Sequence, residues 1–75
     1  MNTIELRDMR PGDRARIVAV SGTQDRLHEL GMVPGTEIEF VRIAPFGDPV
    51  EILVRGTRLC LRRSDMAGIQ VERIP

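Results

Sequence analysis

The sequence has no tryptophan and no tyrosine, and its only aromatic residues are Phe40 and Phe46. Domains that bind proline-rich peptides need a groove lined by aromatic side chains, and proteins that bind single-stranded nucleic acid need aromatic rings on which bases stack. The composition argues against both. The 11 basic and 11 acidic residues cancel, so the basic excess typical of nucleic-acid binding or of docking on anionic lipid is absent too.

Cysteine is nearly absent as well, since Cys60 stands alone. One cysteine cannot form an intramolecular disulfide, and a small domain without disulfides is typical of a reducing compartment. The N-terminal residues contain no apolar stretch long enough for a signal peptide. No run of the sequence approaches the ~20 apolar residues of a membrane span. We therefore expect a cytoplasmic protein that does not insert into a membrane directly.

Metal ligands and catalytic groups are equally scarce. His28 is the only histidine, and the nearest cluster of ligand types is Asp25, His28 and Glu29. These positions share one face of a helix and could hold a weak divalent ion, although an ordinary solvated helix face explains them as well. No pattern brings His28 to Cys60 as a base beside a nucleophile, and the glycines do not form a phosphate loop. We predict that the protein is not an enzyme and has no bound metal or cofactor.

What is present is a series of short segments with alternating apolar and polar residues, separated by turns rich in Pro and Gly. A chain of 75 residues, 41% of them apolar, suffices for one domain. We predict a mainly β fold, an SH3-like five-stranded small barrel covering residues 1–75 as a single domain, with one short α-helix between strands 1 and 2. An OB-like barrel is the alternative. The expected strands are 14–20, 37–44, 50–55, 58–62 and 69–73.

The expected helix runs from Ser21 to Met32. Ser21 and Thr23 are candidate N-caps. Gly31 is a natural residue for the left-handed conformation that ends helices, with Met32 packing back on Leu27. Three smaller features follow from spacing and turn chemistry: a helical turn near Leu6 and Met9, a bulge at Phe40-Val41, and a helical turn capped by Ser64. A tight hairpin turn is expected at Gly56-Thr57.

Four segments occur in a fixed order that resembles the FeoA family, over about Leu6 to Val71. They are Pro11-Gly12-Asp13, then Arg26-Leu27-x-Glu29-Leu30-Gly31-Met32-x-Pro34-Gly35-Thr36, then Ala44-Pro45-x-Gly47-Asp48-Pro49, and last Val54-Arg55-Gly56 with Leu59-x-Leu61-Arg62. The resemblance implies an SH3-like fold and a cytosolic accessory role in bacterial ferrous iron uptake. The implied partner is the cytosolic, GTP-binding part of the FeoB membrane transporter. The alternative is a divalent-metal-binding or sensing module related to the C-terminal SH3-like domain of DtxR-type repressors.

A protein-binding surface is the remaining hypothesis from the residues themselves. The apolar edge of the helix and its exit, Leu27, Leu30, Met32 and Val33, could stay open as a groove, or could plug the end of the barrel. Phe46 lies in a turn-rich loop where full burial is difficult, so it is a candidate exposed anchor. We predict that these five residues bind the partner. Unpaired edge strands in so small a barrel also make weak self-association plausible.

Overall fold

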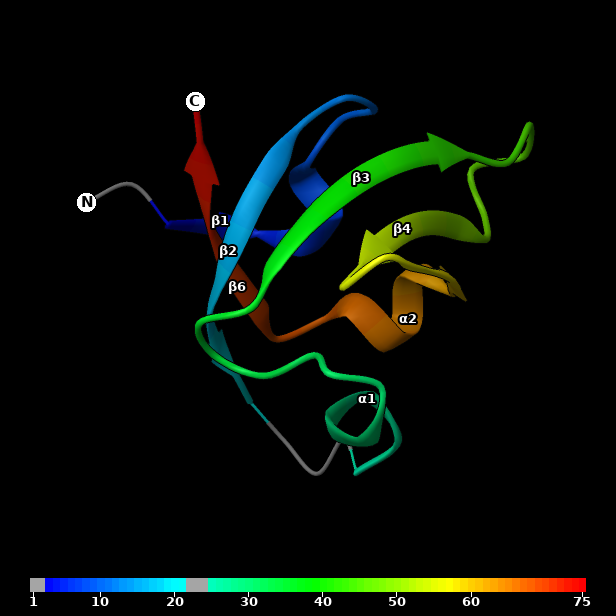
Figure 1. The fold of residues 1–75 in the computed structure, drawn as a ribbon. Helices are drawn as coiled ribbons and strands as arrows, with labels where there is room; N and C mark the ends of the chain where they lie inside the picture. The colour runs from blue at the N-terminus through cyan, green and yellow to red at the C-terminus, as the bar shows by residue number, and fades with distance from the viewer. Residues whose placement is uncertain (1–2, 22–24) are drawn as a thin grey trace.

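The computed structural model describes residues 3–21 and 25–75, with the backbone alone at residues 25 and 26. In this part of the chain, six strands form one antiparallel sheet in the order β1-β6-β2-β3-β4-β5 (Figure 1). The strands are β1 (Thr3–Glu5), β2 (Arg14–Val20), β3 (Glu37–Ile43), β4 (Val50–Val54), β5 (Thr57–Leu61) and β6 (Ile69–Ile74). The helical elements are the 3-10 helix η1 (Leu6–Asp8), α1 (Asp25–Glu29) and α2 (Arg63–Met66).

The core lies on the concave face of this curled sheet. Phe40 on β3 is fully buried in this core. Strand β4 buries every second side chain, as the alternation of the sequence predicts. Leu27 and Met32 from the α1 region pack in the same cluster. A domain this small has one such cluster and depends on it for stability. Among the described residues, no helix has the length and apolar character needed to cross a bilayer.

The mainly β class is confirmed, but there are six strands rather than the five expected. The additional strand is β1, which pairs with β6 through the register Thr3↔Glu72 to Glu5↔Gln70. Three residues are too few to produce a recognisable alternation, so β1 could be found only through its pairing partner. The helical turn expected near Leu6 is the helix η1.

Two bulges bend the sheet. The bulge predicted at Phe40-Val41 is present as a register shift between Phe40 and Arg42, and it returns Ile43 to the core side of β3. A second bulge between Ile17 and Ala19 in β2 was not predicted. It turns Ala19 outward, so Ala19 is exposed although it lies two residues after the buried Ile17.

Helix α1 ends at Glu29, before the Met32 expected as its last residue, but Gly31 stops it in the left-handed conformation as predicted. Gly31 has a φ of 94°, its N–H donates to the carbonyl of His28 at 3.1 Å, and the N–H of Met32 donates to the carbonyl of Leu27 at 2.9 Å. These two bonds define a Schellman motif. Of the two N-cap candidates, Thr23 lies outside the described residues, and the hydroxyl of Ser21 donates to the carbonyl of Gly68 at 3.1 Å.

Two turns differ by one residue from the sequence-based expectation. The loop between β4 and β5 is Arg55-Gly56 rather than Gly56-Thr57, and both of its residues have positive φ, 51° and 81°. Arginine is an unusual residue for that conformation, so the sequence did not reveal it. Helix α2 begins at Arg63, its N-cap residue is Arg62, and Ser64 does not cap it.

Candidate functional site

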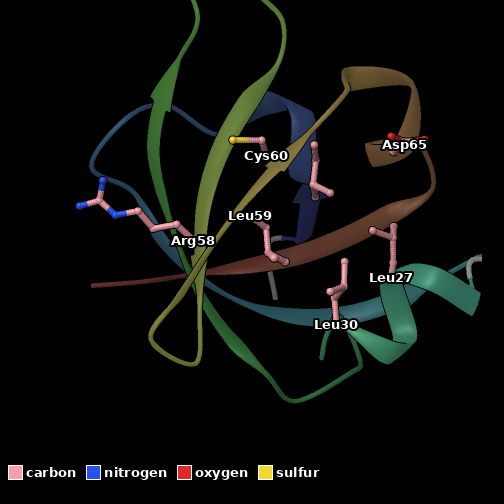
Figure 2. A pocket seen from close by; sticks show the side chains of 7 residues that line it. Leu27, Leu30, Arg58, Leu59, Cys60 and Asp65 are labelled. Atoms are coloured by element: carbon pink, nitrogen blue, oxygen red, sulfur yellow. The ribbon is translucent and has the colours of Figure 1, made fainter.

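A pocket of about 230 Å³ opens between α1 and β5. We call it the α1–β5 pocket. Its lining residues are Leu27, Leu30, Arg58, Leu59, Cys60, Leu61 and Asp65. In Figure 2, Leu27 and Leu30 from α1 and its end point toward Leu59 on β5, whereas Arg58 and Cys60 point to the other side of the strand. Apolar side chains from two elements distant in the sequence therefore face one another across the pocket.

The end of α1 determines how its two leucines are presented. Leu27 is 3% exposed, because its carbonyl closes the Schellman motif that holds the last turn against the core. Leu30 follows on the same side of the helix and is 39% exposed. Leu27 thus forms part of the pocket floor, and Leu30 forms an apolar rim that solvent reaches.

The opposite wall is a strand at the edge of the sheet. Leu61 is 6% exposed, and Leu59 is partly buried against the core. The pocket touches four consecutive residues of β5, from Arg58 to Leu61. A cavity on one face of a strand would meet alternate side chains only, so the α1–β5 pocket lies along the backbone edge of β5.

Phe46 is presented separately, on the loop between β3 and β4, and is fully exposed. This loop is held by Arg63, whose backbone N–H donates to Asp48 Oδ1 at 2.8 Å and whose Nε donates to the carbonyl of Gly47 at 2.8 Å. Inside the loop, the N–H of Gly47 donates to the carbonyl of Ala44 at 2.8 Å. The phenyl ring therefore projects into solvent from a hydrogen-bonded loop.

The structure separates the five predicted partner-binding residues into three locations. Leu27 and Leu30 meet at the α1–β5 pocket. Met32 is 1% exposed in the core and Val33 is partly buried, and neither of them lines the pocket. Phe46 lies on the loop between β3 and β4, and Figure 1 shows this loop well apart from α1.

Sequence reasoning did not include Leu59 and Leu61 in the site. The two leucines alternate with Arg58 and Cys60 and therefore share one face of β5. The sequence contains no local signal that this face lies opposite α1, because more than two dozen residues separate the two elements along the chain.

The charged residues that line the α1–β5 pocket are Arg58 and Asp65. Arg58 lies 3.3 Å from a carboxylate oxygen of Glu51. Within the part of the chain that the structure describes, no three His, Cys, Asp or Glu residues gather as a metal site requires. The expected weak cluster of Asp25, His28 and Glu29 depends on the Asp25 side chain, which lies outside the described residues.

The curled sheet and the short helix across its end, with a leucine-lined pocket between that helix and β5, are the features of a small SH3-like module. The FeoA domain family matches residues 4–73, and the chain belongs to this family.

Three relatives are similar to the chain. A fusion of Fe(2+) transport protein A with the Fe(2+) transporter FeoB from Porphyromonas gingivalis is 39% identical over 74 residues, which are 95% of this chain and 9% of the fusion protein. The FeoA protein from Chlorobium tepidum has a TM-score of 0.88 and 35% identity, over 96% of this chain and 71% of its own. The FeoA from Stenotrophomonas maltophilia, described as a procaryotic SH3 domain protein complexed with zinc, has a TM-score of 0.80 and 29% identity, over 92% of this chain and 89% of its own. The chain thus spans a small fraction of the curated fusion relative.

Proposed function

We propose that this protein is a cytoplasmic, non-catalytic accessory protein of bacterial ferrous iron uptake, forming one domain over residues 1–75. Its partner is the cytosolic, GTP-binding part of a FeoB-type transporter. The observation that carries this proposal is the Porphyromonas gingivalis relative, in which the same kind of domain is part of one chain with FeoB. Two domains that occur in one chain in one organism are good candidates for association as separate chains in another.

The α1–β5 pocket is the proposed contact surface, with Phe46 as a second contact. An apolar side chain of the partner that entered this concave pocket would displace water from the partly exposed leucines around it, which favours binding. A wholly exposed aromatic ring on a hydrogen-bonded loop loses little conformational freedom on binding. Met32 and Val33 contribute by holding the end of α1, because the N–H of Met32 donates to the carbonyl of Leu27 and the N–H of Val33 donates to the carbonyl of Gly31.

The test is a calorimetric titration of the chain against the purified cytosolic part of a FeoB-type transporter, without nucleotide, with GDP and with a GTP analogue. We expect binding that Leu30→Asp abolishes and Phe46→Ala weakens. Val18→Asp is the matched control, because Val18 is 40% exposed and Leu30 39%, while Val18 does not line the pocket. Absence of binding in all three nucleotide states would contradict the proposal, and an equal loss from Val18→Asp would remove the pocket from it.

A second candidate is a divalent-metal-binding or sensing module. The observation that favours it is the zinc complex of the Stenotrophomonas maltophilia relative. On this chain the ligands would include His28 and Glu29, both exposed at the end of α1. Calorimetry with Zn²⁺ and with Fe²⁺ under reducing conditions would show stoichiometric binding that His28→Ala weakens. If the unsubstituted protein and the His28→Ala variant gave the same heats of metal binding, this candidate would be rejected.

A further inference from the structure

Strand β5 has a free edge, because it is the last strand in the sheet order and, within residues 3–21 and 25–75, pairs only with β4. Arg55 and Gly56 form the two-residue loop between these strands, and the first pair of the ladder is Val54↔Thr57. In hairpins with such loops, the two residues that flank the loop form a hydrogen-bonded pair. The ladder that starts at Val54↔Thr57 therefore determines which N–H and C=O groups of β5 form hydrogen bonds with β4.

Hydrogen-bonded and non-hydrogen-bonded pairs alternate along an antiparallel ladder. Thr57, Leu59 and Leu61 therefore direct their N–H and C=O groups toward β4, whereas Arg58 and Cys60 direct theirs toward the free edge. No further backbone hydrogen bond of Arg58 or Cys60 occurs among the described residues. The free edge thus offers two N–H donors and two C=O acceptors, spaced as a further strand would require.

The α1–β5 pocket lies against this same edge. Arg58 and Cys60 line it together with Leu59 and Leu61, and Leu30 forms its exposed rim. Its volume of about 230 Å³ compares with the roughly 150 Å³ of an apolar cavity that holds benzene. One leucine- or phenylalanine-sized side chain would therefore fit, from a strand whose backbone pairs with β5.

The charge around the edge favours an acidic occupant. Residues 50–66 carry four arginines, at 55, 58, 62 and 63, against two carboxylates, Glu51 and Asp65. The difference is two positive charges on a chain whose net charge is zero. The Arg58 side chain is 72% exposed beside its Glu51 partner, so this pair is weak and a second carboxylate can share the guanidinium.

We infer that the partner contributes an extended, acidic segment that adds to β5 as a further strand of the sheet. One large apolar side chain of the segment enters the α1–β5 pocket, and its carboxylates face Arg58 and Arg62. The mode is β-strand addition, in which backbone hydrogen bonds supply affinity and a pocket supplies specificity. This inference rests on the proposed function for the identity of the partner, although its chemistry can be tested independently.

The test removes a single N–H from the free edge. Cys60→Pro deletes the N–H that points away from β4, a position where an edge strand tolerates proline, and Cys60→Ala is the matched control that keeps this N–H. The probes are the cytosolic part of a FeoB-type transporter and a short synthetic peptide of alternating glutamate and valine with a central leucine. We expect Cys60→Pro to weaken the binding of both probes by about three- to tenfold, the effect of one lost hydrogen bond. Cys60→Ala should weaken it by less than about twofold, because the N–H is kept.

Amide hydrogen exchange gives a second readout that does not depend on the proline variant folding. In the free protein the amides of Arg58 and Cys60 should exchange fast and those of Leu59 and Leu61 slowly. Saturation with the acidic peptide should slow Arg58 and Cys60, and a peptide with lysine in place of each glutamate should do so only weakly. Amides of Arg58 and Cys60 that stay unprotected at saturation would overturn strand addition.

The outcomes separate this inference from the proposed function. If the transporter part binds and Leu30→Asp abolishes the binding while Cys60→Pro weakens it no more than Cys60→Ala does, strand addition is wrong and the proposed function stands. If only the acidic peptide binds, with protection of Arg58 and Cys60, strand addition stands and the proposed partner is wrong. Protection that is already present in the free protein and grows with its concentration would mean that a second copy occupies the edge, which also overturns the inference.

Discussion

The turn that joins α2 to β6 allows a sharp test of how the start of the α1 segment is held. Gly68 has a φ of 83°, and a Cβ atom at this position would clash with Oγ of Ser21. The same Ser21 hydroxyl donates to the carbonyl of Gly68 at 3.1 Å. Gly68→Ala therefore imposes two separate costs, a left-handed backbone for an L-residue and the displacement of the Ser21 hydroxyl from its hydrogen bond.

Both costs can be estimated. An alanine in the left-handed region costs about 1–2 kcal/mol, and the loss of one hydrogen bond costs about 0.5–1.5 kcal/mol. The Ser21 side chain can rotate away, since the Cβ of Ser21 would lie 3.6 Å from the new methyl group, which is an ordinary contact. We expect Gly68→Ala to lower the free energy of unfolding by about 1.5–3.5 kcal/mol, from a total of about 4–11 kcal/mol for a chain of this length.

A double-mutant cycle distinguishes this explanation from general damage to the turn. Ser21→Ala alone should cost about 0.5–1.5 kcal/mol, but almost nothing in the Gly68→Ala background, because the hydrogen bond is already lost there. The measurement is urea unfolding followed by far-ultraviolet circular dichroism, since the chain has no tryptophan or tyrosine to report by fluorescence. Equal costs of Ser21→Ala in the two backgrounds would refute the reasoning.

Two further predictions concern stability. The two phenylalanines differ completely in exposure, 0% for Phe40 and 100% for Phe46. Phe40→Ala should therefore lower the free energy of unfolding by about 3–5 kcal/mol, and Phe46→Ala by less than about 0.5 kcal/mol. Similar thermal midpoints for the two variants would contradict the assigned burial. Arg55→Asn should raise stability by about 0.5–1 kcal/mol in the same unfolding assay, because asparagine tolerates the positive φ of this turn better. The bond that Arg55 donates to Thr36 is long, at 3.5 Å, so little is lost with the guanidinium, and a lower midpoint would show that this bond matters more than the turn.

The regular alternation in the sequence predicted most of the sheet, because each of the longer strands buries one face. It predicted the β3 bulge for the same reason, since Phe40 and Val41 break the period. The β2 bulge escaped because Ile17, Val18 and Ala19 are all apolar and give no break in the pattern. Strand β1 escaped because its three residues are ordered by β6 rather than by their own sequence.

The sequence indicated the α1 side of the candidate site but not its β5 side. Leu27 and Leu30 stood out at helical spacing beside the Gly31 stop, and Phe46 stood out as an aromatic residue in a turn-rich loop. The wall formed by Leu59 and Leu61 could not be inferred, because it depends on the way α1 crosses the end of the sheet beside β5. Contacts between residues that are distant along the chain are determined by packing, and local sequence patterns do not reveal them.

The pairing of β1 with β6 also determines how the domain can be tethered. Thr3 lies opposite Glu72, so the described chain enters and leaves the sheet at one place. Figure 1 shows β1 and the end of β6 on the side of the molecule opposite β4 and α2. A linker attached at either end would leave the β5 edge unobstructed. Joined in this way to a larger protein, the domain would meet its neighbour at an effective concentration of about millimolar, so even a weak contact at the α1–β5 pocket would be largely occupied.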